Sequence, residues 1–299
     1  MTVARLHLVD GTYELFRAHF APRPEHRDPA GADRKATVGV AASLLALLHE
    51  ADEAVTHLAV AFDNPIRSFR NDLFPDYKSD DGVPPELRAQ FDAVEEAVRA
   101  LGVTVWSMRE HEADDGLASG ARRFADEVEQ VRIMTPDKDL GQCLRGTRVV
   151  QVDRRQKKVT DEAAFRAARG FGPESVPDFL ALTGDTADGI PGLPGFGEKS
   201  AGTLIGAYAH IEAIPAYPSQ WTVKPRGALQ LAATLAERRD EAIFYRRLAT
   251  LVDTVPLAES LEDLRFRGVP RARFESWCDA LGTTTLRTAP RRWADEEAA

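Results

Sequence analysis

Three aspartates of this sequence stand at the ends of short apolar runs. They are Asp10, Asp63 and Asp137, which follow the runs 6–9, 57–62 and 131–134. Carboxylate oxygens without histidine or cysteine beside them are hard ligands, which select Mg²⁺ or Mn²⁺ rather than zinc. If the fold gathers these side chains, the sequence predicts a divalent-cation site.

Two acidic segments enlarge this set. Glu112-Ala113-Asp114-Asp115 opens an expected helix, and Asp137-Lys138-Asp139 opens another. Residues three apart share a helix face, so Glu112 and Asp115 point to the same side. Acids are also common at helix N-termini and in turns, and this structural interpretation fits any one position. It fits the whole set poorly, because converging carboxylates repel one another unless cations neutralise them.

The elements that must position these acids follow an alternating pattern. Apolar runs predict strands at 6–9, 57–62, 103–106 and 131–134, and helical spacing predicts helices at 37–51, 84–101 and 112–124. This alternation is typical of a parallel α/β sheet, in which ligands bind beyond the carboxyl ends of the strands. After about residue 165 the pattern is mainly helical, with one expected strand at 248–252 and a small helix carrying Phe274, Trp277 and Leu281. Residues 285–299 are weakly patterned.

A glycine-rich segment between two expected helices carries a different chemistry. Gly192, Gly195 and Gly197 allow a tight turn and a close approach of backbone N–H groups to a ligand. The helix that begins at Glu198 would direct its positive end outward, which suits a phosphate. Glycines alone fit an ordinary turn equally well. The full pattern G-x-P-G-x-G-x-K-[ST]-A over 192–201 instead indicates a helix-hairpin-helix, which binds a nucleic-acid backbone without reading its sequence.

Composition limits the alternatives. The 299 residues include 38 Lys and Arg against 47 Asp and Glu, a formal net charge of -9, which argues against a protein that coats nucleic acid. The longest apolar run, 38–48, is shorter than the ~20 residues of a membrane span, and no secretory leader is recognisable. Two distant cysteines support neither a disulfide framework nor a zinc site. We therefore expect two domains, no membrane and a cytoplasmic location.

One alternative chemistry is suggested by Asp10-Gly11-Thr12, which is similar to the nucleophile loop of haloacid-dehalogenase-like phosphatases. That loop needs an aspartate two positions earlier, where this chain has Leu8. We therefore disfavour a phosphatase.

Six ordered motifs resemble the bacterial 5′-nuclease family, which comprises the 5′-3′ exonuclease domain of DNA polymerase I and stand-alone flap endonucleases. The motifs are Leu8-Val9-Asp10-Gly11, Ala61-Phe62-Asp63, Phe69-Arg70 with Tyr77-Lys78, Glu112 to Asp115, Thr135 to Asp139, and Leu182 to Ala201. The likeness covers about residues 4–257. It implies a hydrolase that cuts 5′ flaps and nicked or branched duplex DNA in replication and repair, with Mg²⁺ or Mn²⁺.

The resemblance also implies an architecture. A PIN-like nuclease domain would span 1–165, with a helical arch at about 66–84, and a helix-three-turn-helix DNA-binding domain would span 166–257. Residues 258–299 would form a C-terminal extension whose last part is flexible. No polymerase module follows in this sequence, so we expect a free-standing, monomeric nuclease.

By the same resemblance, nine carboxylates would bind two or more metal ions, and two such ions clamp the scissile phosphate and activate a water. Asp10, Asp63, Glu112, Asp114 and Asp115 would hold the first ion, and Asp137, Asp139, Asp185 and Asp188 the second. Asp115 and Asp137 also count among the expected catalytic residues, with Lys78 and Arg70 on the scissile phosphate. The expected DNA-binding residues are Arg17, Tyr77 as a base-stacking ring, Gly192, Gly195, Gly197, Lys199 and Ser200, with a K⁺ ion at the hairpin.

Other basic residues and three departures complete the interpretation. The segments 154–158 and 238–239 are further phosphate candidates, although solvated loops fit them better. Asp81 replaces the usual arginine of the arch, Gly189 an asparagine and Pro136 a small residue. Two alternatives stay open. A PIN-like ribonuclease would cut RNA in preference to flap DNA, and a DNA-binding protein with weak catalysis would bind flaps without cutting them.

Overall fold

The computed structural model describes residues 4–294, which form two compact units. Among the described residues, unit 1 comprises 4–66, 80–135 and 253–294, and unit 2 comprises 67–79 and 136–252. None of the helices among residues 4–294 has the length and apolar character that crossing a membrane requires.

Unit 1 contains four parallel strands in the order β3-β2-β1-β4. Their bounds are β1 Arg5–Asp10, β2 His57–Asp63, β3 Thr104–Met108 and β4 Gln130–Met134. Every residue of β2 is buried, as expected for a central strand of a parallel sheet that is covered on both faces. The predicted parallel α/β class is confirmed.

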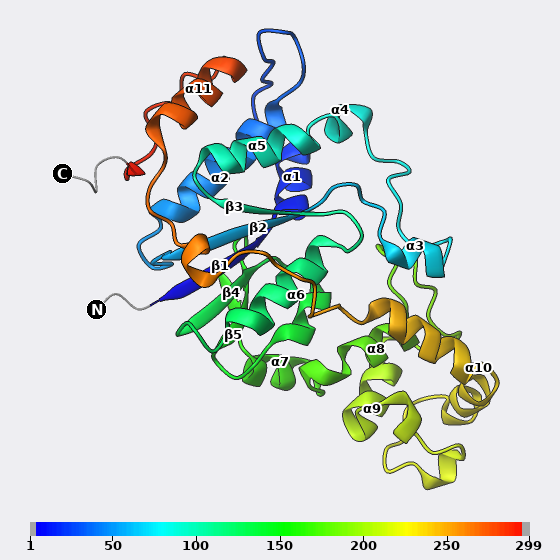
Figure 1. The fold of residues 1–299 in the computed structure, drawn as a ribbon. Coiled ribbons are helices and arrows are strands. Elements are labelled where there is room, and N and C mark those ends of the chain that lie inside the picture. The colour runs from blue at the N-terminus through cyan, green and yellow to red at the C-terminus, as the bar shows by residue number, and fades with distance from the viewer. Residues whose placement is uncertain (1–3, 295–299) are drawn as a thin grey trace. The chain divides into compact units, whose positions relative to one another are not determined.

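Helices cover both faces of these strands. Figure 1 shows α2 and α5 on one face and α6 on the other. The helices of unit 1 are α1 Gly11–Phe20, α2 Lys35–His49, α4 Pro85–Arg88, α5 Phe91–Ala100, α6 Ala113–Phe124 and α11 Arg271–Leu281, with a 3₁₀ helix η5 at Leu261–Leu264. The single helix expected at 84–101 is two helices, since the chain turns between Arg88 and Phe91.

Two helices, α1 and α6, pack closely against strands of the sheet, and the N-termini of both helices carry acidic residues. Helix α1, which the sequence did not predict, begins directly after β1, and a Cβ on Gly11 would lie 2.5 Å from the Phe62 ring of β2. Helix α6 packs closely on β3, since a Cβ on Gly120 would lie 2.6 Å from the Trp106 ring. Glycine at these positions lets both helix N-termini, with their carboxylates, sit near the ends of the strands.

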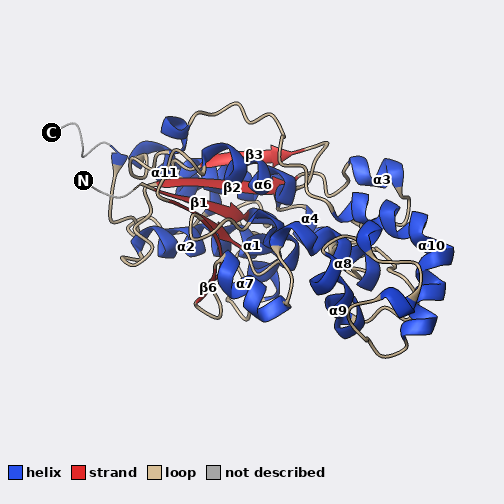
Figure 2. Ribbon diagram, turned by 90° about the horizontal axis from the view of Figure 1, so that it is seen from below, coloured by secondary structure: helices blue, strands red, loops and turns tan. Residues whose placement is uncertain are grey.

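Unit 2 is mainly helical and has its own apolar core, which includes Leu180, Leu204, Leu235 and Tyr77. Helices α3, α8, α9 and α10, which are labelled in Figure 2, belong to unit 2. Its elements are α3 Phe69–Leu73, η1 Lys138–Cys143, β5 Val149–Asp153, β6 Lys158–Thr160, α7 Glu162–Arg169, η2 Pro173–Ser175, α8 Val176–Thr183, α9 Glu198–Tyr208, η3 Ile211–Ala213, η4 Pro218–Gln220 and α10 Ala228–Ala249. Strands β5 and β6 form an antiparallel pair that the sequence did not predict.

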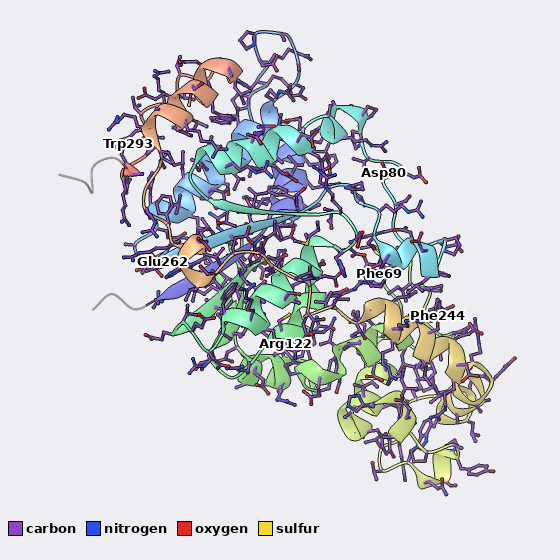
Figure 3. All side chains as sticks on the ribbon, viewed as in Figure 1. Phe69, Asp80, Arg122, Phe244, Glu262 and Trp293 are labelled. Carbon is purple, nitrogen blue, oxygen red and sulfur yellow. The ribbon has the colours of Figure 1, made fainter. Side chains whose placement is uncertain are left out.

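One sequence prediction for the C-terminal part, the strand at 248–252, is wrong. The expected strand at 248–252 is the end of α10 followed by extended chain. The weakly patterned segment after residue 285 is packed as far as it is described: Trp293, labelled in Figure 3, is 8% exposed, and its ring lies 6.3 Å from that of Phe274. The small helix around Phe274 is confirmed as α11. Residues 295–299 of the expected flexible end lie outside the described residues.

The compact units differ from the expected domain ranges 1–165 and 166–257, because residues 136–165 belong to unit 2. These ranges remain a proposal about domain organisation. Within the expected arch, 66–84, the only helix of the described chain is α3, whose N-terminus is capped by Ser68.

Candidate metal centre

Three carboxylates of unit 2 lie together. Oxygens of Asp139, Asp185 and Asp188 are within 4.8 Å of one another, close enough to share one metal ion. Asp139 is in the first turn of η1, which Asp137 caps by accepting the Asp139 N–H at 2.9 Å. Asp185 lies in the turn after α8, where its side chain accepts the Ala187 N–H at 3.0 Å. Two separate turns therefore fix the cluster.

Of the three aspartates, Asp139 has a buried carboxylate oxygen whose negative charge no hydrogen bond stabilises. It is 5% exposed, and its Oδ1 atom is buried without a hydrogen-bond partner. Burial, followed by the charges of Asp137, Asp188 and Asp185, raises the pKa of Asp139 well above its ordinary value. An unpartnered buried carboxylate oxygen among like charges is costly for a fold, and a bound cation removes that cost. These residues fit a divalent ion.

Two lysines border the cluster. Lys138 Nζ lies 2.9 Å from Asp185 Oδ2, and Lys78 Nζ lies 3.6 Å from Asp188 Oδ1. Burial would lower the pKa of Lys138, but the hydrogen bond to Asp185 and the neighbouring negative charges raise it above its usual value. The backbone N–H of Lys78 also donates to the Asp188 carbonyl at 3.0 Å, which fixes that segment beside the cluster.

Unit 1 holds the carboxylates expected to bind the first ion. Asp10 ends β1, where its Oδ1 accepts the Tyr13 N–H at 2.8 Å and its Oδ2 accepts the Thr135 hydroxyl at 3.1 Å. Asp63 ends the neighbouring strand β2, and its Oδ1 accepts the Ala113 N–H at 2.7 Å. Both side chains are 6% exposed.

The hydrogen bond from Ala113 brings the start of α6 to Asp63. Glu112 caps α6, and its backbone N–H donates to Asp115 Oδ2 at 3.0 Å. Asp115 is fully buried, whereas Asp114 is partly exposed. Asp10 and Asp63 thus end adjacent strands, and the other three carboxylates lie at the start of α6; none of the five is part of the Asp139 triplet. That all nine meet around shared ions stays a prediction.

The glycine-rich segment forms a hairpin between α8 and α9. Gly192 has a φ of +70°, and a Cβ there would lie 2.4 Å from the Gly184 nitrogen. Gly195 has a φ of +84°. The Leu193 N–H donates to the Leu182 carbonyl at 2.8 Å, which closes the turn. The hairpin geometry that the sequence predicted is therefore present, and two of its glycines are required by the backbone.

The third glycine is placed differently. Gly197 has an ordinary φ of -93°, and a Cβ there would meet open space. It caps α9, with its N–H donated to Ser200 Oγ at 3.1 Å. Lys199 is exposed in the first turn of α9. An exposed helix N-terminus beside a lysine is a suitable environment for a phosphate group.

Arg70 and Tyr77 lie where direct DNA contacts are not available. Arg70 is 1% exposed and donates to the Leu248 carbonyl at 2.8 Å and the Thr250 carbonyl at 2.9 Å. Tyr77 is 3% exposed in the core of unit 2. Contacts to a scissile phosphate or a base would require segment 67–79 to rearrange, so this structure gives both residues a packing role.

The other basic candidates are also engaged within the protein. The Arg17 guanidinium binds Glu14 and donates to Ser43 Oγ at 2.8 Å. Arg239, on helix α10, donates to the carbonyls of Ile211 and Ile214 at 2.9 and 3.0 Å. Residues 154–157 form the turn between β5 and β6, and Lys158 begins β6.

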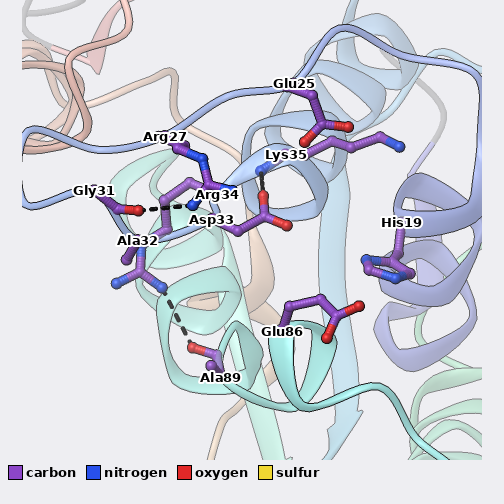
Figure 4. Close-up of a pocket in the computed structure, with 10 residues that line it drawn as sticks. All are labelled: His19, Glu25, Arg27, Gly31, Ala32, Asp33, Arg34, Lys35, Glu86 and Ala89. Atoms are coloured by element: carbon purple, nitrogen blue, oxygen red, sulfur yellow. Dashed lines mark hydrogen bonds between the residues drawn. The ribbon is translucent and has the colours of Figure 1, made fainter.

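Sequence reasoning did not assign a role to Lys138, and the only signal for it was its place between two aspartates. It also missed a pocket of about 680 Å³ in unit 1, at the start of α2 and beside α4 (Figure 4). Basic and acidic side chains both line this pocket, including Lys35, Glu25, Glu86 and His19. None of the expected site residues lines it.

Comparisons with known proteins agree with this arrangement. Residues 5–170 match the family described as 5′-3′ exonuclease, N-terminal resolvase-like domain, and residues 171–272 match 5′-3′ exonuclease, C-terminal SAM fold. A 5′-3′ exonuclease of Bacillus subtilis is 35% identical over 269 residues, covering 88% of each chain. DNA polymerase I of Bacillus caldotenax is 32% identical over 284 residues, which are 93% of this chain and 31% of that protein. The chain thus spans about a third of the polymerase relatives.

Solved structures share the fold. A T5 5′-exonuclease with bound zinc has a TM-score of 0.66 at 15% identity, covering 93% of this chain and 99% of that one. The catalytic core of Rad2 in complex with DNA substrate has a TM-score of 0.58 at 14% identity, covering 96% and 91%. With both family models matched in order along residues 5–272, this chain belongs to the 5′-3′ exonuclease family.

Proposed function

We propose that this protein is a metal-dependent 5′ nuclease that hydrolyses phosphodiester bonds in 5′-flap, nicked or branched DNA during replication and repair. The observation that carries the proposal is the triplet of Asp139, Asp185 and Asp188, in which a buried carboxylate oxygen has no partner within the protein. Family membership and the hairpin between α8 and α9 agree with it.

The proposed chemistry follows from the charge distribution. A divalent ion, Mg²⁺ or Mn²⁺, would lower the pKa of an attacking water and neutralise the leaving oxygen when bound. The turns of Asp137 and Asp185 would hold the carboxylates in place, and Lys78 would contact the scissile phosphate. Asp10, Asp63, Glu112, Asp114 and Asp115 are the proposed ligands of the other ion. Asp115 and Asp137 are retained as catalytic residues.

DNA would be held by the hairpin of unit 2. Gly192 and Gly195 shape the turn, and the first turn of α9, with Gly197, Lys199 and Ser200, would receive a backbone phosphate, with a K⁺ ion at the hairpin. Arg17 is a further proposed DNA-binding residue. Solved structures that share this fold are described with bound zinc and with a DNA substrate, which agrees with a metal ion and DNA in this fold. We further propose that the protein acts as a monomer in the cytoplasm, the latter on the basis of its two-cysteine composition.

Cleavage of end-labelled substrates tests the function. Wild-type protein should cut a 5′-flap duplex with Mn²⁺ or Mg²⁺ and lose activity in EDTA. Asp139→Asn should lower the cleavage rate by at least 100-fold while binding the flap within a few-fold of wild type. Asp240→Asn, an exposed aspartate on α10, serves as the matched control. Cleavage in EDTA would refute the metal assignment, and a preference for single-stranded RNA would favour the ribonuclease alternative.

A further inference from the structure

Lys138 is a basic residue that contacts the metal cluster. Its ammonium nitrogen lies 2.9 Å from Asp185 Oδ2, a distance at which the two groups share a charge-assisted hydrogen bond. The Asp185 side chain is 6% exposed, whereas that of Lys138 is 43% exposed. The ammonium therefore enters the cluster from the solvent side.

The two lysines of the cluster are held differently. Lys78 is fixed through its backbone, because its N–H donates to the Asp188 carbonyl, and its ammonium stands 3.6 Å from Asp188 Oδ1. Lys138 contacts Asp185 through the end of a flexible four-carbon side chain that is nearly half exposed. Lys138 can rotate into solvent without moving the backbone, since each carbon–carbon bond has alternative staggered positions.

A divalent ion would bind the same aspartate that Lys138 contacts. Asp185 belongs to the triplet whose oxygens lie within 4.8 Å of one another, and Asp139 of the same triplet has a buried carboxylate oxygen without a hydrogen-bond partner. A cation bound by this triplet would stand close to the Lys138 ammonium, and two positive charges at such a distance repel each other. The ion and the Lys138 ammonium therefore compete for Asp185, and binding of one weakens the interaction of the other with this carboxylate.

We propose that Lys138 is a built-in competitor of the divalent ion: its ammonium occupies Asp185 until the ion displaces it. The inference rests on the proposed function and deepens it, because it names the residue that sets how tightly the triplet holds its metal. Lys138 has two expected effects. It stabilises the acidic cluster without metal, and it weakens metal binding.

Direct metal binding without DNA tests this. Titration of wild type, Lys138→Met and Lys138→Arg with Mn²⁺, followed by electron paramagnetic resonance of the free ion, gives the dissociation constants. Lys138→Met should bind Mn²⁺ at least tenfold more tightly, and Lys138→Arg, which keeps the charge, no more tightly than wild type. In EDTA, Lys138→Met should melt at a lower temperature than wild type and gain more from added Mn²⁺. Lys158→Met, at an exposed position of β6, controls for loss of a positive charge.

The outcomes separate the two proposals. An unchanged or weaker Mn²⁺ affinity in Lys138→Met, with wild type binding the ion through Asp139, would overturn the role of Lys138 and leave the nuclease proposal standing. If neither protein binds Mn²⁺ through Asp139, the proposed function fails as well. Lys138→Gln carries the same expectation as Lys138→Met and replaces it should that variant not fold.

Discussion

Replacing Asp139 by asparagine should make the metal-free protein more stable. At 4.8 Å, two like charges repel by about 3 kcal/mol in a medium of effective dielectric constant ~20. Asp139 experiences the charges of Asp185 and Asp188, and the Lys138 ammonium offsets part of this repulsion. Asparagine keeps the shape, removes the charge and adds N–H donors for the neighbouring carboxylates. We therefore expect a gain of about 2 kcal/mol, or roughly 4–8 °C in melting temperature.

The assay is thermal unfolding at mildly alkaline pH, in EDTA and in Mn²⁺. In EDTA, Asp139→Asn should melt above wild type, and in Mn²⁺ the order should reverse, because only wild type gains from a bound ion. Asp240→Asn should follow wild type in both buffers. If Asp139→Asn is less stable than wild type in EDTA, or gains equally from Mn²⁺, then Asp139 is not an uncompensated ligand and the reasoning about the cluster is refuted.

Three further predictions concern the stability of the fold. Arg70→Met should lower the free energy of unfolding by about 2–4 kcal/mol in urea titrations, since it leaves two backbone carbonyls without their donor; an unchanged midpoint would contradict the packing role. Gly189→Ala should destabilise by about 1–3 kcal/mol, because φ is +73° and a Cβ would lie 2.3 Å from a backbone carbonyl oxygen, whereas Gly197→Ala should leave stability unchanged. Burial lowers the pKa of His7 below its ordinary 6.5, so the unfolded chain binds more protons at low pH, and stability should fall as the pH drops below about 6.5. Urea midpoints should show a shallower pH dependence in His7→Gln, and an unchanged dependence would exclude this contribution.

Much of unit 1 was predictable because its determinants are local. Short apolar runs that end in aspartate predict buried parallel strands and an acidic edge, and Asp10 and Asp63 lie there. Helix α1 escaped prediction because Asp10-Gly11 has the composition of a turn, although Gly11 serves instead to fit α1 against Phe62. The strand expected at 248–252 failed because tertiary contacts, here between the end of α10 and Arg70, override the propensity of a short apolar segment.

The site itself was only partly predictable. The aspartates of the cluster were identified by motif spacing, but sequence gives no distances, so neither the unpartnered oxygen of Asp139 nor the pairing of Lys138 with Asp185 was visible. The role of Arg70 on the scissile phosphate was implied by the resemblance to the 5′-nuclease family. The partners of Arg70 lie 178 and 180 residues away in the chain, a separation at which local pattern carries no information.

The most direct measurement is the anomalous scattering of a manganese-soaked crystal of the wild-type protein. We predict a manganese peak at coordination distance from oxygens of Asp139, Asp185 and Asp188, with the Lys138 ammonium displaced from Asp185. A crystal that holds manganese elsewhere, while these three carboxylates keep only protein contacts, would contradict the metal centre on which the proposed nuclease activity depends.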